Sequence, residues 1–554
     1  MRERIKLKNG KTLSKKLLKK AFNSSRWKIV SIACLIILFS KQNLLSNDSL
    51  NKIIDIQVQK FRNILEIVKD NYYKEDIDFV SISENAFNSL LQSLDKFSQY
   101  FSATQYKNYK DSYKGSTLGI GLQFFRRGDT LMAFYVVKGS PADSAGIEAG
   151  DKIIYINHEY CIGKDANFAN KKISESPNNV AVITVKKDGV LKEFAIPLKE
   201  VEIPSVVAKL KLEKDIGYIR ISRFALSTQK ELTTAIDSLI KISCKFLILD
   251  LRGNTGGYLD EVISISKLFL KKGDTVVIVS GKETNRKVYV NEEDGKYARL
   301  PFIILADENT ASAGEIFASA MQDNDRAYVL GERTYGKGLI LKNWEFKDGS
   351  AFRLTTGEYV SPLGRKIQKE TLDKVEFDGF PDLTLPQQQR ETIESLIKNF
   401  GVTNNLPIFV TKKGRTLFGG GGVFPDFYFA SDTTPLYLKK LKSNGYVNDF
   451  VLRFFIEDSK MFRKLKNLLL SEFLDNFGIS NDAIDSFKKY LMQRNVFVEN
   501  YFLEESDKIV SELKATIAYI LYGDSGYYSC AIQKDKIISR VKNLRTVSEN
   551  LVKQ

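Results

Sequence analysis

Residues 309–341 read NTASAGEIFASAMQDNDRAYVLGERTYGKGLIL and decide how the fold is interpreted. The apolar run LPFIILA (300–306) precedes them and is typical of a buried strand. Ser312 opens a run of helical character, AGEIFASAMQ, and Lys337 lies between two glycines near the end. A strand, a short loop and a helix in this order predict an α/β layer around a central sheet.

Ser312 is predicted at the N-terminus of this helix. The first backbone N–H groups of a helix lack intrahelical partners, and the helix dipole favours negative charge there. The N–H of Ala313 is therefore a natural donor to an oxyanion. A serine at a helix start is also a common N-cap, so the position alone leaves both interpretations of Ser312 open.

Lys337 has the flanking glycines that a sharp turn of the backbone needs. A lysine with an ordinary pKa of about 10.4 is a poor base at neutral pH, so a catalytic role requires burial that lowers the pKa. The sequence does not reveal that burial. Without other signals, Lys337 would be interpreted as a surface lysine in a loop.

The chain around this stretch alternates strand-like and helix-like segments. The predicted strands are IGYIRIS, KFLILD, DTVVIVS and LPFIILA, and the predicted helices run from Thr228 to Ile242 and from about Tyr258 to Leu270. Such alternation predicts an α/β core, which we place at 201–430. Two further glycine loops interrupt it, LRGNTGGYLD (251–260) and FGGGGVFPD (418–426).

Upstream of the core, 50–110 is predicted to form a helical hairpin. Apolar residues recur at spacings of three and four from Ile54 to Tyr72, and a second helix is expected at the capping-box pattern of Ser81 and Glu84. Downstream, 431–554 reads as lysine-rich and aromatic-rich helices, for example 465–473 and 509–521. No chemistry is evident in this C-terminal extension, which we expect to pack on the core or on another subunit.

Residues 112–200 contain short β-like runs separated by Gly, Pro and Asp turns. The segments VVKGSPADSAGI (136–147) and AGDKIIYIN (149–157) resemble a PDZ domain. The resemblance implies that backbone amides of a loop capture a peptide's terminal carboxylate while the peptide adds a strand to the sheet. In this chain that loop would consist of Leu118, Gly119, Ile120 and Gly121.

The histidine and cysteine content narrows the chemistry. His158 is the only histidine, so a zinc site built on several histidines is excluded, and a Ser-His-Asp triad would require this residue. His158 falls where a tight turn is expected, which favours a structural or exposed role. Cys34, Cys161, Cys244 and Cys530 have no metal-binding or redox spacing and are interpreted as isolated buried thiols.

The N-terminus carries most of the formal charge of +16. Residues 1–28 hold eleven Lys/Arg and one acid, Glu3, so a nucleic-acid partner loses most of its support. The apolar run IVSIACLIILF (29–39) follows directly. A basic segment before an apolar one is typical of an export signal, either a signal peptide or a membrane anchor, and a buried core helix is the alternative. We expect membrane association or export, with the catalytic part in a periplasm-like space.

A nucleotide site is a weaker possibility. GERTYGKG (331–338) fits seven positions of a phosphate-binding P-loop, and FLILD, ending at Asp250, resembles a strand whose acid holds magnesium. Gly338 occupies the position that requires Ser or Thr, so the metal-binding hydroxyl is missing. Nucleotide binding is therefore not favoured, and no metal or organic cofactor is expected.

Several motifs together resemble the C-terminal processing peptidases, or tail-specific proteases. LILDLRGNTGGYLDEV, ENTASAGEIFASAMQDNDRA, GERTYGKGL, DGSAFRLTTGEYVSPLGRKIQ and GRTLFGGGGVFPD occur in that family's order within about 50–430. The resemblance implies a Ser312 nucleophile, a Lys337 general base, and oxyanion donors from Ala313 and from Gly256 or Gly257. Two positions depart from the family: Leu341 replaces a glutamine thought to orient the lysine, and Gly314 replaces a common serine.

Two functions are therefore compared. The first is a serine endopeptidase with a Ser-Lys dyad that cleaves polypeptides near their C-termini, in a multi-domain α+β chain whose α/β core carries an inserted PDZ-like domain and helical ends. The second is a catalytically weak PDZ-type scaffold that binds tails, which Leu341 supports. The natural substrate, a homo-oligomeric state and the need for an adaptor are left open.

Overall fold

The computed structural model describes residues 25–553 except 188, 214, 283–284, 370–405, 430–433 and 457–458. The chain divides into two compact units, Met1–Ser89 and Leu90–Gln554. Most of the basic segment 1–28 lies outside the described residues. The apolar run 29–39 falls within helix α2 (Ser25–Asn71), but its side chains lie outside the description. Among helices whose side chains are described, none is both long and apolar enough to cross a membrane.

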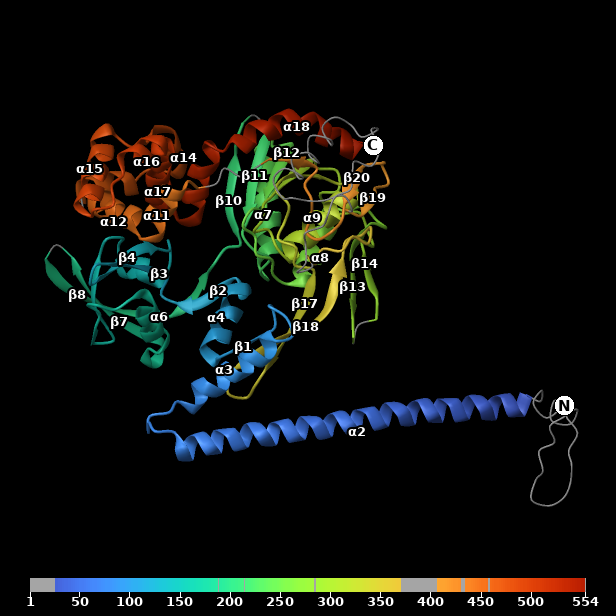
Figure 1. Ribbon diagram of the computed structural model, residues 1–554. Coiled ribbons are helices and arrows are strands. Elements are labelled where there is room, and N and C mark those ends of the chain that lie inside the picture. Colours follow the sequence, from blue (N-terminus) through green and yellow to red (C-terminus); the bar gives the residue numbers. More distant parts are fainter. Residues whose placement is uncertain are drawn as a thin grey trace, which may run out of the picture. The chain divides into compact units, whose positions relative to one another are not determined.

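The first unit consists of α2 and most of α3 (Phe79–Gln92). The expected amphipathic helix from Ile54 to Tyr72 lies in α2, a single long helix in Figure 1, except for its last residue, since α2 ends at Asn71. The second helix begins near Ser81, as expected, but Ser81 does not cap it. Asp78 Oδ1 accepts the N–H of Ser81 at 3.0 Å, so the helix begins two residues before the serine that we interpreted as its cap.

A six-stranded sheet forms the α/β core of the second unit. Its five parallel strands have an antiparallel strand at one edge, in the order β10 (Val206–Lys211), β11 (Ile216–Ile221), β12 (Phe246–Asp250), β15 (Phe302–Ala306), β16 (Tyr328–Gly331) and β21 (Phe427–Tyr428). Every residue of β12 and β15 is buried. Strands covered on both faces read as continuous apolar runs, which explains FLILD and FIILA.

Helices cover both faces of this sheet (Figure 1). Leu247 and Leu249 of β12 pack with α7 (Thr228–Lys241), α8 (Leu259–Lys267) and α9 (Ala313–Asp323). Phe246 and Ile248, on the opposite face, pack with α18 (Lys536–Lys553). The C-terminal extension therefore completes one layer of the core.

A second sheet is antiparallel and contains a strand that we assigned to the central sheet. β13 (Thr275–Gly281) pairs with β14 (Lys287–Val290) and with the ten-residue β18 (Ala351–Val360). β18 also pairs with β1 (Gln99–Phe101) and β17 (Leu339–Glu345). The expected place of DTVVIVS was wrong because an apolar run does not specify which strand will pair with it.

The PDZ-like region contains a sheet in the order β3-β4-β5-β7-β8, with α6 (Ala166–Ser174) close to β3. Its strands are β3 (Leu122–Arg127), β4 (Thr130–Val136), β5 (Lys152–Ile156), β6 (Glu159–Tyr160), β7 (Val180–Lys187) and β8 (Val190–Pro197). The run GIGLQFF (119–125), one of the β-like runs in this region, is divided between two strands. Gly121 has a φ of 77°, which turns the chain between β2 (Ser116–Gly119) and β3.

The C-terminal extension is helical from α11 (Leu436–Ser443) onward. The expected helix over 465–473 is interrupted, since α13 (Ser459–Lys466) ends before α14 (Leu470–Asn476) begins. The expected helix over 509–521 is confirmed within α17 (Ser506–Gln533).

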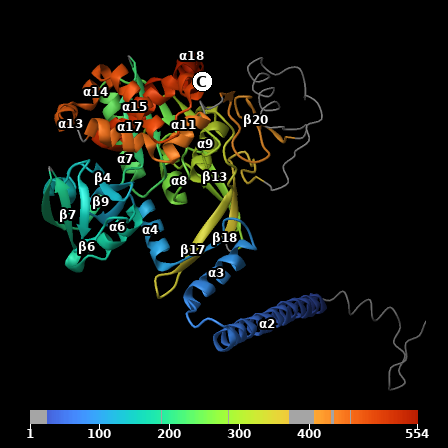
Figure 2. The same ribbon diagram turned by 60° about the vertical axis from the view of Figure 1, so that its left-hand side comes forward.

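This extension packs against β4 of the PDZ-like region (Figure 2). Leu131 and Ala133 face the PDZ-like core, whereas Met132 and Phe134 are buried among the C-terminal helices. Burial of both faces explains why TLMAFYVV reads as one apolar run.

Candidate active site

Ser312 lies between β15 and α9, where the sequence predicted it. Its backbone has φ 55° and ψ −116°, a conformation that residues with a Cβ rarely adopt. The side chain makes no cap hydrogen bond to α9 within the described structure. Ser312 thus occupies the N-cap position of α9, where its backbone N–H donates to Glu315 Oε2 at 2.9 Å.

The loop after β12 brings Gly256 against Ser312. Asn254 is fully buried, donates through Nδ2 to the Ile221 carbonyl at 2.9 Å, and accepts the N–H of Ala311 at its own carbonyl at 2.8 Å. A Cβ on Gly256 would lie 2.6 Å from the Ser312 Cβ and 3.0 Å from the Ala313 nitrogen. Only a glycine allows this close approach.

The same loop distinguishes the two glycines proposed as oxyanion donors. The Gly256 N–H donates to Asn254 Oδ1 at 2.9 Å, so it is already engaged. Gly257 has a φ of 157°, and a Cβ there would meet the Phe224 carbonyl oxygen at 2.0 Å. The geometry therefore favours the N–H of Gly257, together with that of Ala313 at the start of α9.

Lys337 is partly buried, and a base needs such burial to lower its pKa. Burial and, secondarily, the positive charge of Arg353 lower the pKa of Lys337 to about 8, although Glu315 and Asp95 oppose the change. The Nζ lies 4.8 Å from the centroid of the Phe97 ring. Gly336 has a φ of 88°, and a Cβ on Gly338 would lie 2.4 Å from the backbone nitrogen of Gln368. Gly336 thus allows the sharp turn, and Gly338 allows the close contact with the backbone of Gln368.

Glu315 is the residue that our reasoning from the sequence missed. It is fully buried in the first turn of α9. Its Oε2 accepts the backbone N–H groups of Ser312 at 2.9 Å and of Lys337 at 2.8 Å. Its Oε1 accepts the Thr334 hydroxyl at 2.5 Å and the Gly336 N–H at 2.7 Å. The Ser-x-x-Glu spacing from Ser312 was the signal that could have identified it.

Burial raises the pKa of Glu315 above its usual value, and the four donors act in the opposite direction. Tyr359 adds a second link between the same loops. Its hydroxyl lies 3.0 Å from the Ser312 carbonyl oxygen and within hydrogen-bond distance of the Lys337 carbonyl oxygen. One acid and one phenol therefore hold the backbone of Ser312 beside that of Lys337.

The two residues that depart from the family pattern lie close to this arrangement. Leu341 is in β17, opposite Thr355 of β18. A Cβ on Gly314 would lie 3.1 Å from Thr310 Cγ2 and 3.4 Å from Asn254 Oδ1. The absence of a side chain at position 314 therefore leaves room for Thr310 and Asn254, which lie in the loops next to Ser312.

The apparent nucleotide signals have another explanation. Asp250 is fully buried and binds Tyr218 Oη at 2.7 Å, Arg220 Nη1 at 2.9 Å and Arg252 Nη2 at 2.7 Å. Charged neighbours hold the pKa of Asp250 well below its usual range. Its carboxylate is thus occupied by two guanidinium groups rather than directed toward a metal.

The other sequence-predicted groups lie elsewhere. Leu118 and Gly119 belong to β2, which pairs with β9 (Lys199–Glu202), while Ile120 and Gly121 form the turn into β3. His158 is exposed in a turn with a φ of 64°, so its expected place is confirmed. Cys161, Cys244 and Cys530 are buried and free, as expected, and the Cys34 side chain lies outside the described residues.

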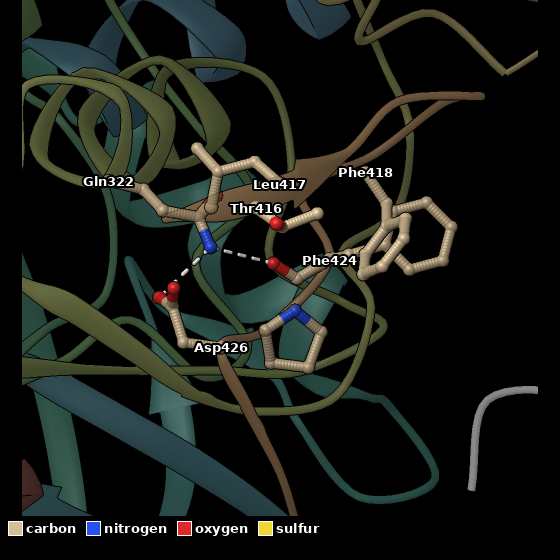
Figure 3. A pocket seen from close by; sticks show the side chains of 7 residues that line it. Gln322, Thr416, Leu417, Phe418, Phe424 and Asp426 are labelled. Carbon is tan, nitrogen blue, oxygen red and sulfur yellow. Dashed lines mark hydrogen bonds between the residues drawn. The ribbon is translucent and has the colours of Figure 1, made fainter. Parts of the chain in front are cut away.

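A small pocket at the other end of α9 is not part of the candidate site (Figure 3). It is lined by Gln322, residues 416–418 and residues 424–426. Gln322 Nε2 donates to the Phe424 carbonyl at 2.9 Å and to Asp426 Oδ2 at 3.0 Å. Gln322 thus attaches the C-terminal end of α9 to the segment that leads into β21.

Comparison with known proteins identifies three matching regions. Residues 215–378 match peptidase family S41, residues 117–198 match the PDZ domain, and residues 437–523 match a family of unknown function. The first two correspond to the core that carries Ser312 and to the PDZ-like region.

Two curated relatives agree over about two thirds of their length. A probable CtpA-like serine protease of Staphylococcus aureus (strain MSSA476) is 31% identical over 357 residues, which cover 64% of this chain and 70% of the relative. The carboxy-terminal processing protease CtpA of Bacillus subtilis (strain 168) is 33% identical over 318 residues, which cover 57% of this chain and 68% of the relative.

Among solved structures, a photosystem II D1 C-terminal processing protease is 23% identical, with a TM-score of 0.31, covering 54% of this chain and 82% of that one. The curated relatives, together with the two matched domains, decide the assignment. The chain belongs to the CtpA-like carboxy-terminal processing serine proteases of peptidase family S41.

Proposed function

We propose that Ser312 is the nucleophile and Lys337 the general base of this protease. The observation that carries the proposal is the Glu315 carboxylate, which accepts the backbone N–H groups of both residues. The lowered pKa of Lys337, about 8, supports it further, because a fraction of the side chain is then neutral at physiological pH.

The proposed reaction is acyl transfer. Neutral Lys337 accepts the Ser312 Oγ proton while Oγ forms a bond to the scissile carbonyl carbon. The N–H groups of Ala313 and Gly257 donate to the oxyanion that develops on the carbonyl oxygen. Protonated Lys337 then gives the proton to the departing amine, and water hydrolyses the acyl-enzyme by the reverse sequence.

Tail recognition is proposed for the PDZ-like region. β3 pairs with β4 on one side and lies at the edge of its sheet, so a substrate strand could add along the other side. Residues 118–121, the end of β2 and the turn after it, lead directly into β3 and would receive the terminal carboxylate. We propose that substrates are polypeptides with a free, apolar C-terminus.

Turnover of the purified full-length chain tests these roles. A peptide with an apolar free C-terminus should be cleaved, its C-terminally amidated form should be cleaved more slowly, and Ser312→Ala should abolish cleavage of both. Equal cleavage of the free and amidated peptides would contradict carboxylate recognition. Unchanged turnover by Ser312→Ala would contradict the nucleophile.

The scaffold alternative is not favoured. It rested on Leu341, whose substitution for glutamine removes one way of orienting Lys337. The Lys337 backbone is instead held by Glu315, and the neighbouring Gly338 N–H donates to Gln368 Oε1 at 3.0 Å. These contacts position the loop without a side-chain hydrogen bond from residue 341.

We also propose that the N-terminal segment directs the chain to the membrane, with the catalytic part in a periplasm-like space. The basic residues of 1–28 followed by the apolar run 29–39 support this. External protease should degrade the catalytic part once the outer layer of cells is opened, but not in intact cells. Protection until the cytoplasmic membrane is broken would contradict the proposal.

A further inference from the structure

The C-terminal extension places a carboxylate beside the active-site loop. Arg252, at the start of this loop, uses Nε and Nη2 to bind Asp250 at 3.0 and 2.7 Å. Its remaining terminal nitrogen, Nη1, lies 2.7 Å from Asp535 Oδ2. The side chains of Arg252 and Asp535 are only 14% and 15% exposed, so solvent screens this ion pair weakly.

Asp535 is fixed by its own helices. It lies between α17 and α18, and its second oxygen, Oδ1, accepts the N–H of Ile537 at 2.9 Å. The backbone N–H of Asp535 donates to the Ile532 carbonyl at 3.2 Å. Because both its side chain and its backbone are held by hydrogen bonds, Asp535 can position its partner.

The α18 helix is in turn anchored to the core sheet. Ile537, Val541 and Leu544 are buried against residues of β11, β12 and β15. Further along α18, Arg545 Nη1 and Nη2 bind the two carboxylate oxygens of Asp215 at 2.6 and 2.7 Å. The buried contacts of Ile537, two residues from Asp535, therefore fix Asp535 relative to the sheet, whereas the Arg545 pair lies ten residues further along α18.

Arg252 is connected to the reacting groups through a short, tightly held loop. The Arg252 carbonyl accepts Arg220 Nη2 at 2.5 Å, and the next residue, Gly253, donates its N–H to Asp307 Oδ1 at 2.9 Å. Four residues after Arg252 the backbone reaches Gly256, against the Ser312 Cβ. A shift at Arg252 is thus transmitted to the proposed oxyanion donor within five residues.

With Asp535, the direct ion pairs of this cluster contain equal numbers of positive and negative groups. Arg220 and Arg252 bring two positive charges to the Asp250 carboxylate, which supplies one negative charge. Asp535 supplies a second negative charge at Arg252 Nη1, the guanidinium nitrogen that the two bonds to Asp250 leave over. Loss of this charge would leave the poorly solvated Arg252 under-paired and would favour its rearrangement.

We propose that Asp535 is a positioning residue of the active site, which holds Arg252 and thereby the loop that carries Gly256 and Gly257 beside Ser312. The inference rests on the proposed function of those groups. It gives the C-terminal extension a part in catalysis, although its sequence contains no recognisable chemistry.

The test compares Asp535→Asn with Asp215→Asn in the full-length protein. Both variants remove one aspartate charge from an arginine pair between α18 and the core. Asn still caps α18 at position 535. Asp215 precedes β11 whereas Asp250 ends the parallel strand β12, so the control lies at the opposite end of the sheet.

Asp535→Asn is expected to lower kcat about 10- to 100-fold, as a small displacement of catalytic groups does, with KM within about threefold. The affinity for a peptide aldehyde, whose adduct carries the oxyanion, should fall in parallel. Asp215→Asn should keep kcat, and Asp535→Glu should restore at least half of it. If Asp535→Asn does not fold, Asp535→Gln against Asp535→Glu provides the same comparison.

An unchanged kcat in Asp535→Asn, or an equal loss in Asp215→Asn, would overturn the inference while leaving Ser312 and Lys337 in their roles. Turnover by Ser312→Ala would instead overturn the proposed function, and with it the positioning role. The two failures are therefore distinguished by the same set of variants.

Discussion

The backbone N–H groups of Ser312 and Lys337 donate to the same atom, Oε2 of Glu315, at 2.9 and 2.8 Å. The two residues are 25 positions apart and lie in different loops, one before α9 and the other before β17. A shared buried acceptor fixes the distance between the loops more firmly than two separate contacts with solvent-exposed partners could. This arrangement provides preorganisation that a dyad requires.

Glu315→Gln is expected to lower kcat at least tenfold and to destabilise the fold by about 1–3 kcal/mol. Both carboxylate oxygens of Glu315 accept hydrogen bonds, whereas the NH2 group of a glutamine cannot accept one and would face the N–H donors. Thermal unfolding and peptide turnover measure both effects. Glu308→Gln, an exposed change in the loop before α9, should alter neither. Wild-type kcat in Glu315→Gln would show that the shared acceptor is dispensable.

The pH dependence of kcat/KM should report Lys337. Since the neutral amine is the active form and burial lowers its pKa to about 8, activity should rise with pH and level off above about pH 8. The rate at which a sulfonyl fluoride modifies Ser312 should follow the same curve. A profile that levels off near pH 6 would point to another base.

Replacing Lys337 by Met should also change stability with a defined sign. The folded-state pKa of about 8 lies below the ordinary value of 10.5, so the unfolded chain binds more protons between these values. The wild type therefore gains stability as pH rises from about 8 to 10.5. Lys337→Met should be the more stable protein at pH 7, by roughly 2–3 kcal/mol, and should lose that advantage by pH 10.5. A constant difference in the free energy of unfolding across this range would contradict the explanation.

The backbone of Ser312 should store strain. At φ 55° and ψ −116° a Cβ is unfavourable, and such conformations cost of the order of 1–3 kcal/mol. Ser312→Gly should therefore be more stable than Ser312→Ala by about 1 kcal/mol in chemical denaturation, although both lack activity. Equal stability of the two variants would mean that the turn is unstrained.

Leu341→Gln should change kcat by less than about threefold, because Glu315 and Gln368 already hold the loop of Lys337. Turnover of the same peptide by wild type and variant measures this. Cleavage by Leu341→Gln alone, with tail binding but no cleavage by the wild type, would restore the scaffold interpretation.

Phe134 should contribute to attachment of the PDZ-like region to the C-terminal helices. Its ring lies 5.6 Å from that of Phe125 and 5.9 Å from that of Tyr519 in α17, and its side chain is buried. Phe134→Ala should cost about 3 kcal/mol and make the junction sensitive to limited proteolysis. Phe346→Ala removes a half-exposed ring and should have little effect. Equal protection of both variants would contradict the packing role.

Local patterns in the sequence predicted much of the molecule correctly. The strand before Ser312, the helix after it and the tight turn at His158 depend on residues close in the chain, and each was found as expected. The order of the family motifs was sufficient to identify Ser312 and Lys337 as candidates. Two predictions failed for local reasons. Asp78 rather than Ser81 caps α3, and the helix expected over 465–473 is interrupted between α13 and α14. Both features depend on one or two side chains.

By itself, the sequence thus determined which residues could react and which elements carry them, because helix, strand and turn preferences act over a few residues. Only the tertiary structure decided that Lys337 is partly buried, that Glu315 holds both loops, and that β13 joins the second sheet. It alone also placed Asp535 beside Arg252, 283 positions away. Such contacts depend on how whole layers pack, and neither periodicity nor motif spacing encodes the partner of a side chain across that distance.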